Sequence, residues 1–123
     1  MWQVDISYIE DWLDKQDLET VAATFSALEL LEEFGPALGR PLVDTLQHTR
    51  LPNLKELRPA SRGNSEVRIL FAFDPDRRAI MLLAGDKSRG KSGKFKWARW
   101  YKRAIPEAER IFAGHLKGLE DRP

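Results

Sequence analysis

The stretch Val67-Arg68-Ile69-Leu70-Phe71-Ala72-Phe73 holds the strongest strand signal in the chain. Its odd-numbered positions are all apolar, which is the period-two pattern of a β-strand with one buried face. After the turn sequence Asp74-Pro75-Asp76-Arg77 comes a continuous apolar run, residues 79–84. A run without polar positions predicts a central strand that is covered on both faces. Together the two segments predict a β-hairpin inside a sheet.

Weaker signals on both sides of this hairpin complete the expected fold. Residues 2–6 and 54–58 have the composition and alternation of short strands. Apolar residues recur at helical spacing over residues 9–13 and 18–31, which predicts a helical hairpin that ends at Phe34-Gly35-Pro36. Residues 37–53 are expected to be a connection. A helical pattern resumes at Phe95, and Pro106 is expected to break or restart that helix.

The element order β-α-α-β-β-β-α predicts an α+β fold. We expect an N-terminal strand and a helical hairpin packed on a small, mainly antiparallel sheet, followed by a C-terminal helix. The helices are expected to cover one face of the sheet and to leave the other face open. At this length, residues 1–123 are expected to form a single domain.

The composition narrows the range of chemistry and location. The chain has no cysteine, which leaves no thiolate nucleophile, disulfide or thiolate zinc site. His48 and His115 are its two histidines, so imidazole chemistry has few candidates. No signal peptide is evident, and no apolar run approaches the ~20 residues that span a bilayer. We therefore expect a cytoplasmic protein with no membrane contact.

The basic charge is concentrated in one part of the chain. Residues 58–103 carry 13 Lys/Arg against 4 Asp/Glu, whereas residues 1–57 carry 4 against 11 and residues 104–123 carry 3 against 4. The net charge of +1 therefore hides segments of −7, +9 and −1. A basic segment that also contains Trp and Tyr is typical of a nucleic-acid partner, because phosphates require cations and bases require flat faces.

Alternation along the predicted strands brings charged side chains to the face expected to stay open. Glu56 and Arg58 share one face of residues 54–58, and Arg68 points away from the odd-numbered positions of its strand. Lys87 follows the apolar run 79–84 and can reach the same place. The sequence therefore predicts a catalytic group of Arg58, Arg68, Lys87 and Glu56, without evident metal ligands.

Such a group suits the cleavage of RNA without a metal ion or cofactor. The ribose 2′-hydroxyl attacks the adjacent phosphate, and negative charge develops on the phosphate oxygens. Guanidinium groups can stabilise this charge by donating hydrogen bonds to those oxygens. Either Glu56 or a lysine with a depressed pKa is the candidate base, and Lys87 is the candidate acid. The alternative without a catalytic role is that Arg58 and Arg68 lie on a solvent-exposed face or form ordinary salt bridges.

A glycine-rich basic segment, residues 85–94, precedes the last helix. It lacks the G-x-x-x-x-G-K-[ST] spacing of a P-loop, so nucleotide hydrolysis is rejected. It is either a plain solvated loop or a loop that holds phosphates without reading sequence. Trp97, Trp100 and Tyr101 share one helix face, which either packs on the sheet or stacks on bases. The candidate RNA-binding residues are Arg62, Arg89, Lys91, Lys94, Lys96 and Tyr101.

Three segments in this order and spacing, residues 54–58, 67–71 and 82–88, resemble the RelE/ParE superfamily of toxins. The likeness is greatest to the phage-derived, HigB-like branch of type II toxin–antitoxin systems. The tail, residues 100–109, is similar to a version seen in actinobacterial members. The resemblance extends from about Val4 to Leu119 and implies a RelE-like fold.

The resemblance implies a toxin that cleaves mRNA on the ribosome and stops translation. The family's recurrent basic positions fall on Arg58, Arg68 and Lys87. The partners that it implies are mRNA, the ribosome and a cognate antitoxin, often with a helix-turn-helix DNA-binding part. Ser88 replaces the second lysine of the family's Lys-Lys pair, and the catalytic histidines of some members have no clear counterpart.

Two other functions remain open on the sequence alone. ParE-like relatives share the fold but poison DNA gyrase and are not nucleases, and a fold does not decide a function. That alternative predicts that neutralising Arg68 leaves toxicity almost unchanged. The second alternative is a non-catalytic RNA-binding module, which predicts salt-dependent RNA binding without growth arrest.

Overall fold

The computed structural model describes residues 1–47, 49–60, 66–87 and 96–122. Along the chain, the elements are β1 (Gln3–Asp5), the 3-10 turn η1 (Ser7–Ile9), α1 (Glu10–Asp14), α2 (Leu18–Phe34), the 3-10 turn η2 (Gly35–Ala37), β2 (Val43–Thr45), β3 (Lys55–Leu57), β4 (Val67–Phe73), β5 (Arg78–Asp86) and α3 (Lys96–Glu120). None of the helices in these ranges is both long and apolar enough to cross a membrane.

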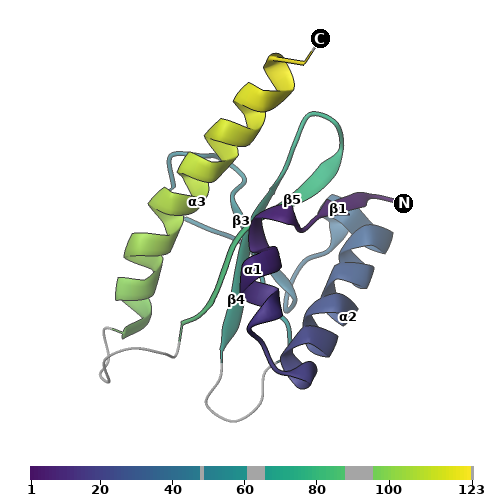
Figure 1. Cartoon of the computed structure of the whole chain (residues 1–123), viewed down its shortest axis with the longest axis vertical. Coiled ribbons are helices and arrows are strands. Elements are labelled where there is room, and N and C mark those ends of the chain that lie inside the picture. The colour runs from purple at the N-terminus through teal and green to yellow at the C-terminus, as the bar shows by residue number, and fades with distance from the viewer. Residues whose placement is uncertain (48, 61–65, 88–95, 123) are drawn as a thin grey trace.

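One five-stranded sheet organises the molecule, in the order β1-β5-β4-β3-β2 (Figure 1). β1 runs parallel to β5, and all other neighbours are antiparallel. The predicted hairpin is β4–β5, and it lies inside the sheet as expected. Residues 79–82 of β5 are buried, which confirms that the apolar run is a covered central strand. The α+β fold with a mainly antiparallel sheet is confirmed.

The helices lie on both faces of the sheet, so the expectation that they cover one face is wrong. α1 and α2 pack on the odd-numbered side of β4, where the core contains Leu28, Leu31 and Phe71. α3 lies on the opposite side, and its Ala108 packs with Leu70. The physical reason is that β4 and β5 are apolar on both faces. An open face would have left Leu70 and its neighbours in water at a cost of about 2 kcal/mol for each large side chain.

Two local expectations are also wrong. The predicted connection contains β2, a three-residue edge strand that pairs with β3 from Val43 to Thr45. So short a strand has too few residues to show alternation. Pro106 lies inside a continuous α3 and does not break it. The proline is exposed, while Ala104 and Ala108 on either side of it are packed on the sheet and hold both halves of the helix in place.

Specific residues define both ends of α2, and its C-terminal end also packs against Trp2, which precedes β1. α2 begins after Asp17, whose side chain accepts a hydrogen bond from the N–H of Thr20 at 2.7 Å. It ends at Gly35, which has a φ of 54°. A side chain at that position would come within 2.2 Å of the Trp2 indole, so glycine permits both the turn and the packing of Trp2.

Candidate functional site

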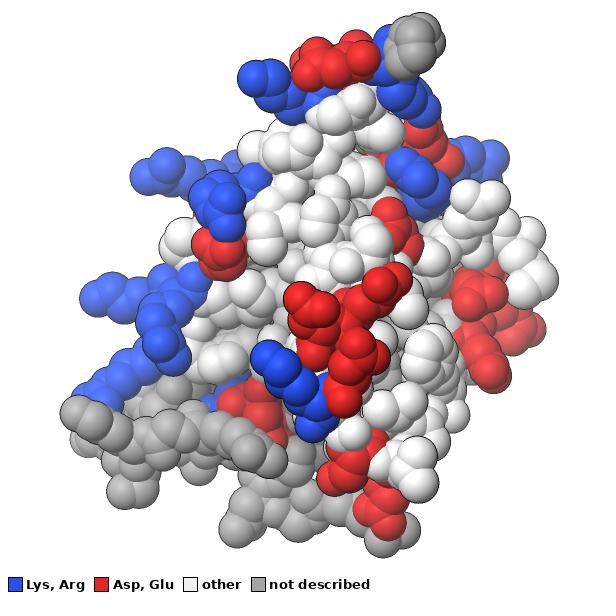
Figure 2. All heavy atoms as spheres, viewed as in Figure 1, with Lys and Arg blue, Asp and Glu red and all other residues white. Residues whose placement is uncertain are grey.

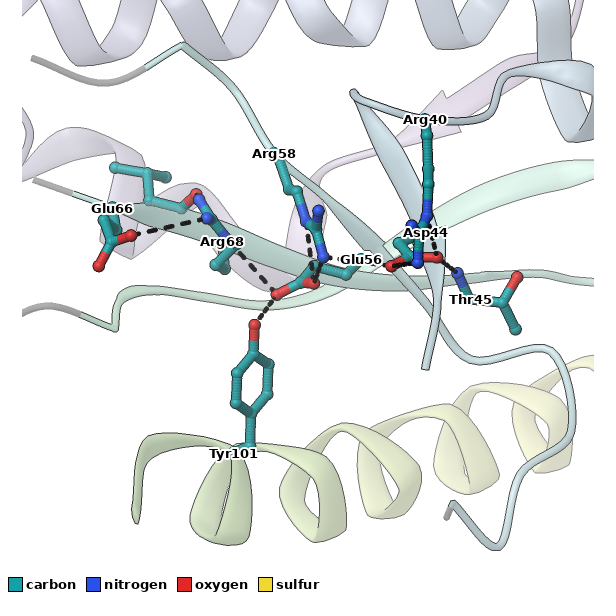
Figure 3. A network of polar contacts seen from close by, with 9 residues as sticks. Arg40, Asp44, Thr45, Glu56, Arg58, Glu66, Arg68 and Tyr101 are labelled. Atoms are coloured by element: carbon teal, nitrogen blue, oxygen red, sulfur yellow. Dashed lines mark hydrogen bonds and ion pairs between the residues drawn. The ribbon is translucent and has the colours of Figure 1, made fainter. Parts of the chain in front are cut away.

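The centre of the predicted site is the carboxylate of Glu56 on β3. Leu57 points into the core under α2, so alternation turns Glu56 toward α3, where its side chain is 1% exposed. Figure 3 shows Tyr101 reaching from α3 to this carboxylate, with Arg58 and Arg68 on either side. A carboxylate so deeply buried requires several partners, and these three side chains provide them.

Arg58 and Arg68 approach different oxygens of Glu56. The Nε and Nη2 atoms of Arg58 each donate to Oε2 at 3.2 Å. The Nε of Arg68 lies 3.5 Å from Oε1, which is ion-pair distance without a hydrogen bond. Tyr101 donates its hydroxyl hydrogen to the same Oε1. The two guanidinium groups are therefore held side by side by one carboxylate that is itself anchored to α3.

Arg68 is the more enclosed of the two arginines, with 14% of its side chain exposed against 33% for Arg58. Its Nη1 donates to the carbonyl of Val67 at 2.8 Å, and its Nη2 lies 4.0 Å from a carboxylate oxygen of Glu66. Arg68 is paired in register with Gly85 of β5. These contacts fix its guanidinium near the start of β4 while leaving part of it accessible.

Arg58 is also bound by Asp44 of β2. Its Nη2 lies 3.3 Å from Oδ2 of Asp44, and Arg40 binds the same carboxylate at 3.0 Å. The hydrogen bonds from Arg40 hold the pKa of Asp44 below its usual value, so Asp44 stays anionic. Sequence reasoning missed Asp44, because its contact with Arg58 depends on the unpredicted strand β2.

Tyr101 and Lys87 complete the cluster. Burial and the hydrogen bond to Glu56 raise the pKa of Tyr101 well above its ordinary value, so its hydroxyl remains a donor. The Nζ of Lys87 lies 5.6 Å from the centre of the Tyr101 ring, within the range of a cation–π contact. Burial, together with the nearby charge of Arg68, lowers the pKa of Lys87. Three cations thus surround one buried carboxylate, an arrangement that can receive a phosphate group.

The structure brings together five of the residues singled out in the sequence: Arg58, Arg68, Lys87, Glu56 and Tyr101. Lys96 is the first residue of α3. The other four RNA-binding candidates lie outside the described residues, namely Arg62, Arg89, Lys91 and Lys94. The face that carries the cluster is covered by α3, so the site lies beside this helix and not on an open sheet.

A second polar cluster lies near the other end of α3, and sequence reasoning missed it. His115 Nε2 lies 2.9 Å from Oδ2 of Asp74, and the hydroxyl of Tyr8 lies 3.1 Å from His115 Nδ1. Arg78 pairs with the same Asp74 oxygen at 3.1 Å. Asp74 follows β4 and is 41 residues from His115 in sequence. The only sequence signal was the polar turn after β4, which does not indicate a partner in α3.

Within the described ranges, no three His, Asp or Glu side chains gather in a way that could hold a metal ion. The charge asymmetry of the sequence is visible on the surface. In the orientation of Figure 1, Figure 2 shows Lys and Arg gathered along the side where α3 lies, while Asp and Glu gather over α1 and α2. Among the α3 residues whose burial the structure describes, the exposed cations are Arg99, Lys102, Arg103, Arg110 and Lys117. A polyanion is therefore attracted to the side of the molecule that carries α3.

Comparison with known proteins gives a consistent assignment. Residues 11–113 match the family described as phage derived protein Gp49-like. The chain is 52% identical over 120 residues to the provisionally designated toxin HigB2 of Mycobacterium tuberculosis, a match that covers 98% of this chain and 57% of that protein. It is 45% identical over 101 residues to the provisionally designated toxin HigB3 of the same organism, which covers 82% of this chain and 81% of the relative. These matches confirm the resemblance seen in the sequence.

Proposed function

The chain belongs to the phage-derived, Gp49-like family, and from this premise we propose that it is the toxin of a two-gene toxin–antitoxin system. Both relatives carry toxin designations, which supports the proposal. We further propose a metal-independent endoribonuclease that acts in the cytoplasm, cleaves mRNA on the ribosome and inhibits translation. The chain spans 57% of the length of the HigB2 relative, so the activity is argued from this chain's own residues.

One observation carries the nuclease proposal: a single buried carboxylate holds two guanidinium groups beside a lysine. In RNA cleavage the 2′-hydroxyl attacks the adjacent phosphorus, and negative charge builds on the non-bridging oxygens. Arg58 and Arg68 would bind those oxygens with forked hydrogen bonds. Because Glu56 already fixes both guanidinium groups, they need little reorganisation when this charge appears. In this proposal Glu56 positions the arginines and does not itself accept the proton, which passes from the 2′-hydroxyl to solvent water.

Lys87 would protonate the 5′-oxygen that leaves. A general acid is most effective when its pKa lies near the working pH, and burial shifts the pKa of Lys87 in that direction. Its ammonium group lies over the Tyr101 ring, and Tyr101 also contacts Glu56. The proton donor and the phosphate-binding arginines are thus connected through one aromatic side chain.

The partners follow from the same proposal. mRNA and the RNA of the ribosome would meet the basic side of the molecule, where the α3 cations lie. A cognate antitoxin, expected to carry a helix-turn-helix DNA-binding part, would neutralise the toxin. These partners are suggested by the family and by charge complementarity with this surface.

The proposal is tested by inducing the chain in a bacterial host and mapping mRNA 5′ ends by primer extension. The test variant replaces Arg58, Arg68 and Lys87 with alanine. A matched control variant removes three exposed cations remote from Glu56 and outside α3, with the substitutions Lys15→Ala, Arg50→Ala and Arg122→Ala. We expect new cuts inside translated reading frames with the wild type and the control, and none with the folded test variant.

Growth arrest without new cuts, equally strong in the test variant, would contradict the nuclease proposal. That result would favour the gyrase-poison alternative, which a supercoiling assay then examines directly. RNA binding without growth arrest would instead favour the non-catalytic RNA-binding module.

A further inference from the structure

A pocket of about 330 Å³ lies between β5 and the first turns of α3. Leu83 and Ala104 form its apolar part, Trp100 supplies an aromatic wall, and Arg103 and Glu107 supply the polar groups. An aromatic face with a few convergent polar groups is typical of a site for a small planar ligand. None of these five side chains takes part in the proposed cleavage step, so the cleavage step does not explain why the pocket is present.

The pocket adjoins the Glu56 cluster through Trp100. The centres of the Trp100 and Tyr101 rings are 5.0 Å apart, and Tyr101 is bound to Glu56. Trp100 also lies against the backbone of Gly85, where an added Cβ would come within 2.8 Å of the indole nitrogen. Gly85 is in turn the register partner of Arg68. A chain of direct contacts therefore joins the pocket wall to the arginines.

The charged groups around the pocket are complementary to the phosphate and the hydrogen-bond donors of a nucleotide. Arg103 is exposed and makes no ion pair within the described part of the chain, and exposed Arg99 and Lys102 lie on the same turns of α3. Glu107 is held by Arg110, which keeps the pKa of Glu107 low and its carboxylate charged. After pairing with Arg110, each carboxylate oxygen still has a lone pair that can accept a hydrogen bond. Cations for a phosphate, an aromatic face and an acceptor thus meet in one place.

We propose that this pocket binds one nucleobase of the RNA, beside the phosphate that is cleaved. The base stacks on Trp100, its amino group donates to Glu107, and Arg103 binds the adjoining phosphate. Adenine, cytosine and guanine present an amino group, whereas uracil does not, so uracil binds most weakly. This inference rests on the proposed function, because it names a substrate contact of the same nuclease.

The first test is an NMR titration of the full chain with the ribonucleoside monophosphates AMP, CMP, GMP and UMP. The readout is the indole N–H signal of Trp100, assigned by its loss in Trp100→Leu. We expect Trp100 to shift on addition of the three amino-bearing nucleotides at lower concentrations than with UMP. Trp100→Leu keeps the apolar bulk but removes the aromatic face, so its affinity, followed by neighbouring amide signals, falls about tenfold, while Trp100→Phe retains most of it.

Two further variants separate recognition from general charge. Glu107→Gln is expected to reduce the discrimination against UMP, because the amide is a weaker acceptor than the carboxylate. Lys102→Gln removes an exposed cation of the same helix that does not line the pocket, and it should keep the discrimination. The same variants can be compared on ribosomes by sequencing the cut sites. Trp100→Leu and Glu107→Gln should weaken the base preference next to the cut, whereas Lys102→Gln should leave it unchanged.

The outcomes for the two proposals are distinguishable. If the wild type cuts RNA while Trp100→Leu leaves nucleotide affinity and base preference unchanged, the pocket proposal is overturned and the nuclease stands. If the wild type binds nucleotides at Trp100 but cuts no RNA, the nuclease fails and the pocket stands as a nucleotide site. Loss of antitoxin binding in Trp100→Leu, with nucleotide affinity unchanged, would overturn the pocket proposal in favour of a protein contact.

Discussion

Two buried carboxylates, Glu56 and Asp74, have similar partners but different roles in the fold. Each is paired with arginine, and each contacts α3, through Tyr101 in one case and His115 in the other. Asp74 also accepts the backbone N–H groups of Asp76 and Arg78, both at 3.0 Å. The hydrogen bonds to Glu56 come from side chains. Asp74 therefore stabilises a turn, whereas Glu56 holds charged groups in position.

Replacing one arginine of each cluster gives the largest expected difference. Arg68→Ala should lower RNA cleavage by about two to three orders of magnitude, because it removes a donor to the charge that develops on the phosphate. Arg78→Ala, the corresponding change beside Asp74, should leave the rate per folded molecule near wild type. Primer extension on equal amounts of folded protein measures both. Equal losses in the two variants would remove the functional distinction between the clusters.

Asp74→Ala should produce the largest loss of stability. It removes the acceptor for Arg78, His115 and two backbone N–H groups, and breaking a buried ion pair of this kind costs about 3 kcal/mol. Urea unfolding followed by circular dichroism measures the change. Cleavage per folded molecule should persist, and its disappearance would place the Asp74 cluster in the reaction after all.

The two tyrosines permit a finer comparison. Tyr101→Phe removes a donor to a buried carboxylate and should lower the free energy of unfolding by about 2 kcal/mol. Tyr8→Phe removes the contact to His115 at an exposed side chain and should cost about 0.5 kcal/mol. Chemical denaturation of both variants gives the order. A larger loss for Tyr8→Phe would mean that the second cluster is the more tightly coupled to α3.

The smallest expected effect is a pH dependence at Asp74. Burial raises the pKa of this carboxyl, but hydrogen bonds from His115 and Arg78 outweigh it, so the pKa is lowered from its ordinary 3.8. A lowered folded pKa gives stability that is present above the unfolded value and is lost as pH falls through the folded value. The stability difference between wild type and Asp74→Ala should therefore shrink below about pH 3.8. Urea unfolding from pH 6 to pH 3 follows it, and a difference that grows toward acid pH would refute the assignment.

Local alternation accounts for what could be predicted. It placed β4, turned Leu57 and Phe71 to one core, and put Glu56 with the arginines on the opposite side, while the continuous apolar run of residues 79–84 placed β5. Helical spacing placed Tyr101 on an aromatic face of the last helix and made it an RNA-binding candidate, but its contact with Glu56 was not predicted. The position of α3 had a signal that went unused, since Leu70 and Ala72 are apolar and required a cover.

The rest depended on contacts between distant parts of the chain. Asp44 reaches Arg58 through β2, whose three residues carry no periodic signal. His115 and Asp74 meet only because α3 crosses the sheet toward the β4–β5 turn. No local pattern encodes a hydrogen bond between residues 41 positions apart, so these groups appear only in the folded chain.

The hydrogen bond between Tyr101 and Glu56 links the docking of α3 to the affinity of the site for its ligand. If the carboxylate holds the arginines best when Tyr101 is in place, docking of α3 strengthens phosphate binding by some free energy. A bound phosphate must then stabilise the docked helix by that same free energy, because coupling between two sites is reciprocal. The coupling also works in reverse, because a partner that draws the first turns of α3 away from the sheet weakens phosphate binding without touching an arginine. Slower amide hydrogen exchange in α3 when the site is filled would be the direct sign of this linkage.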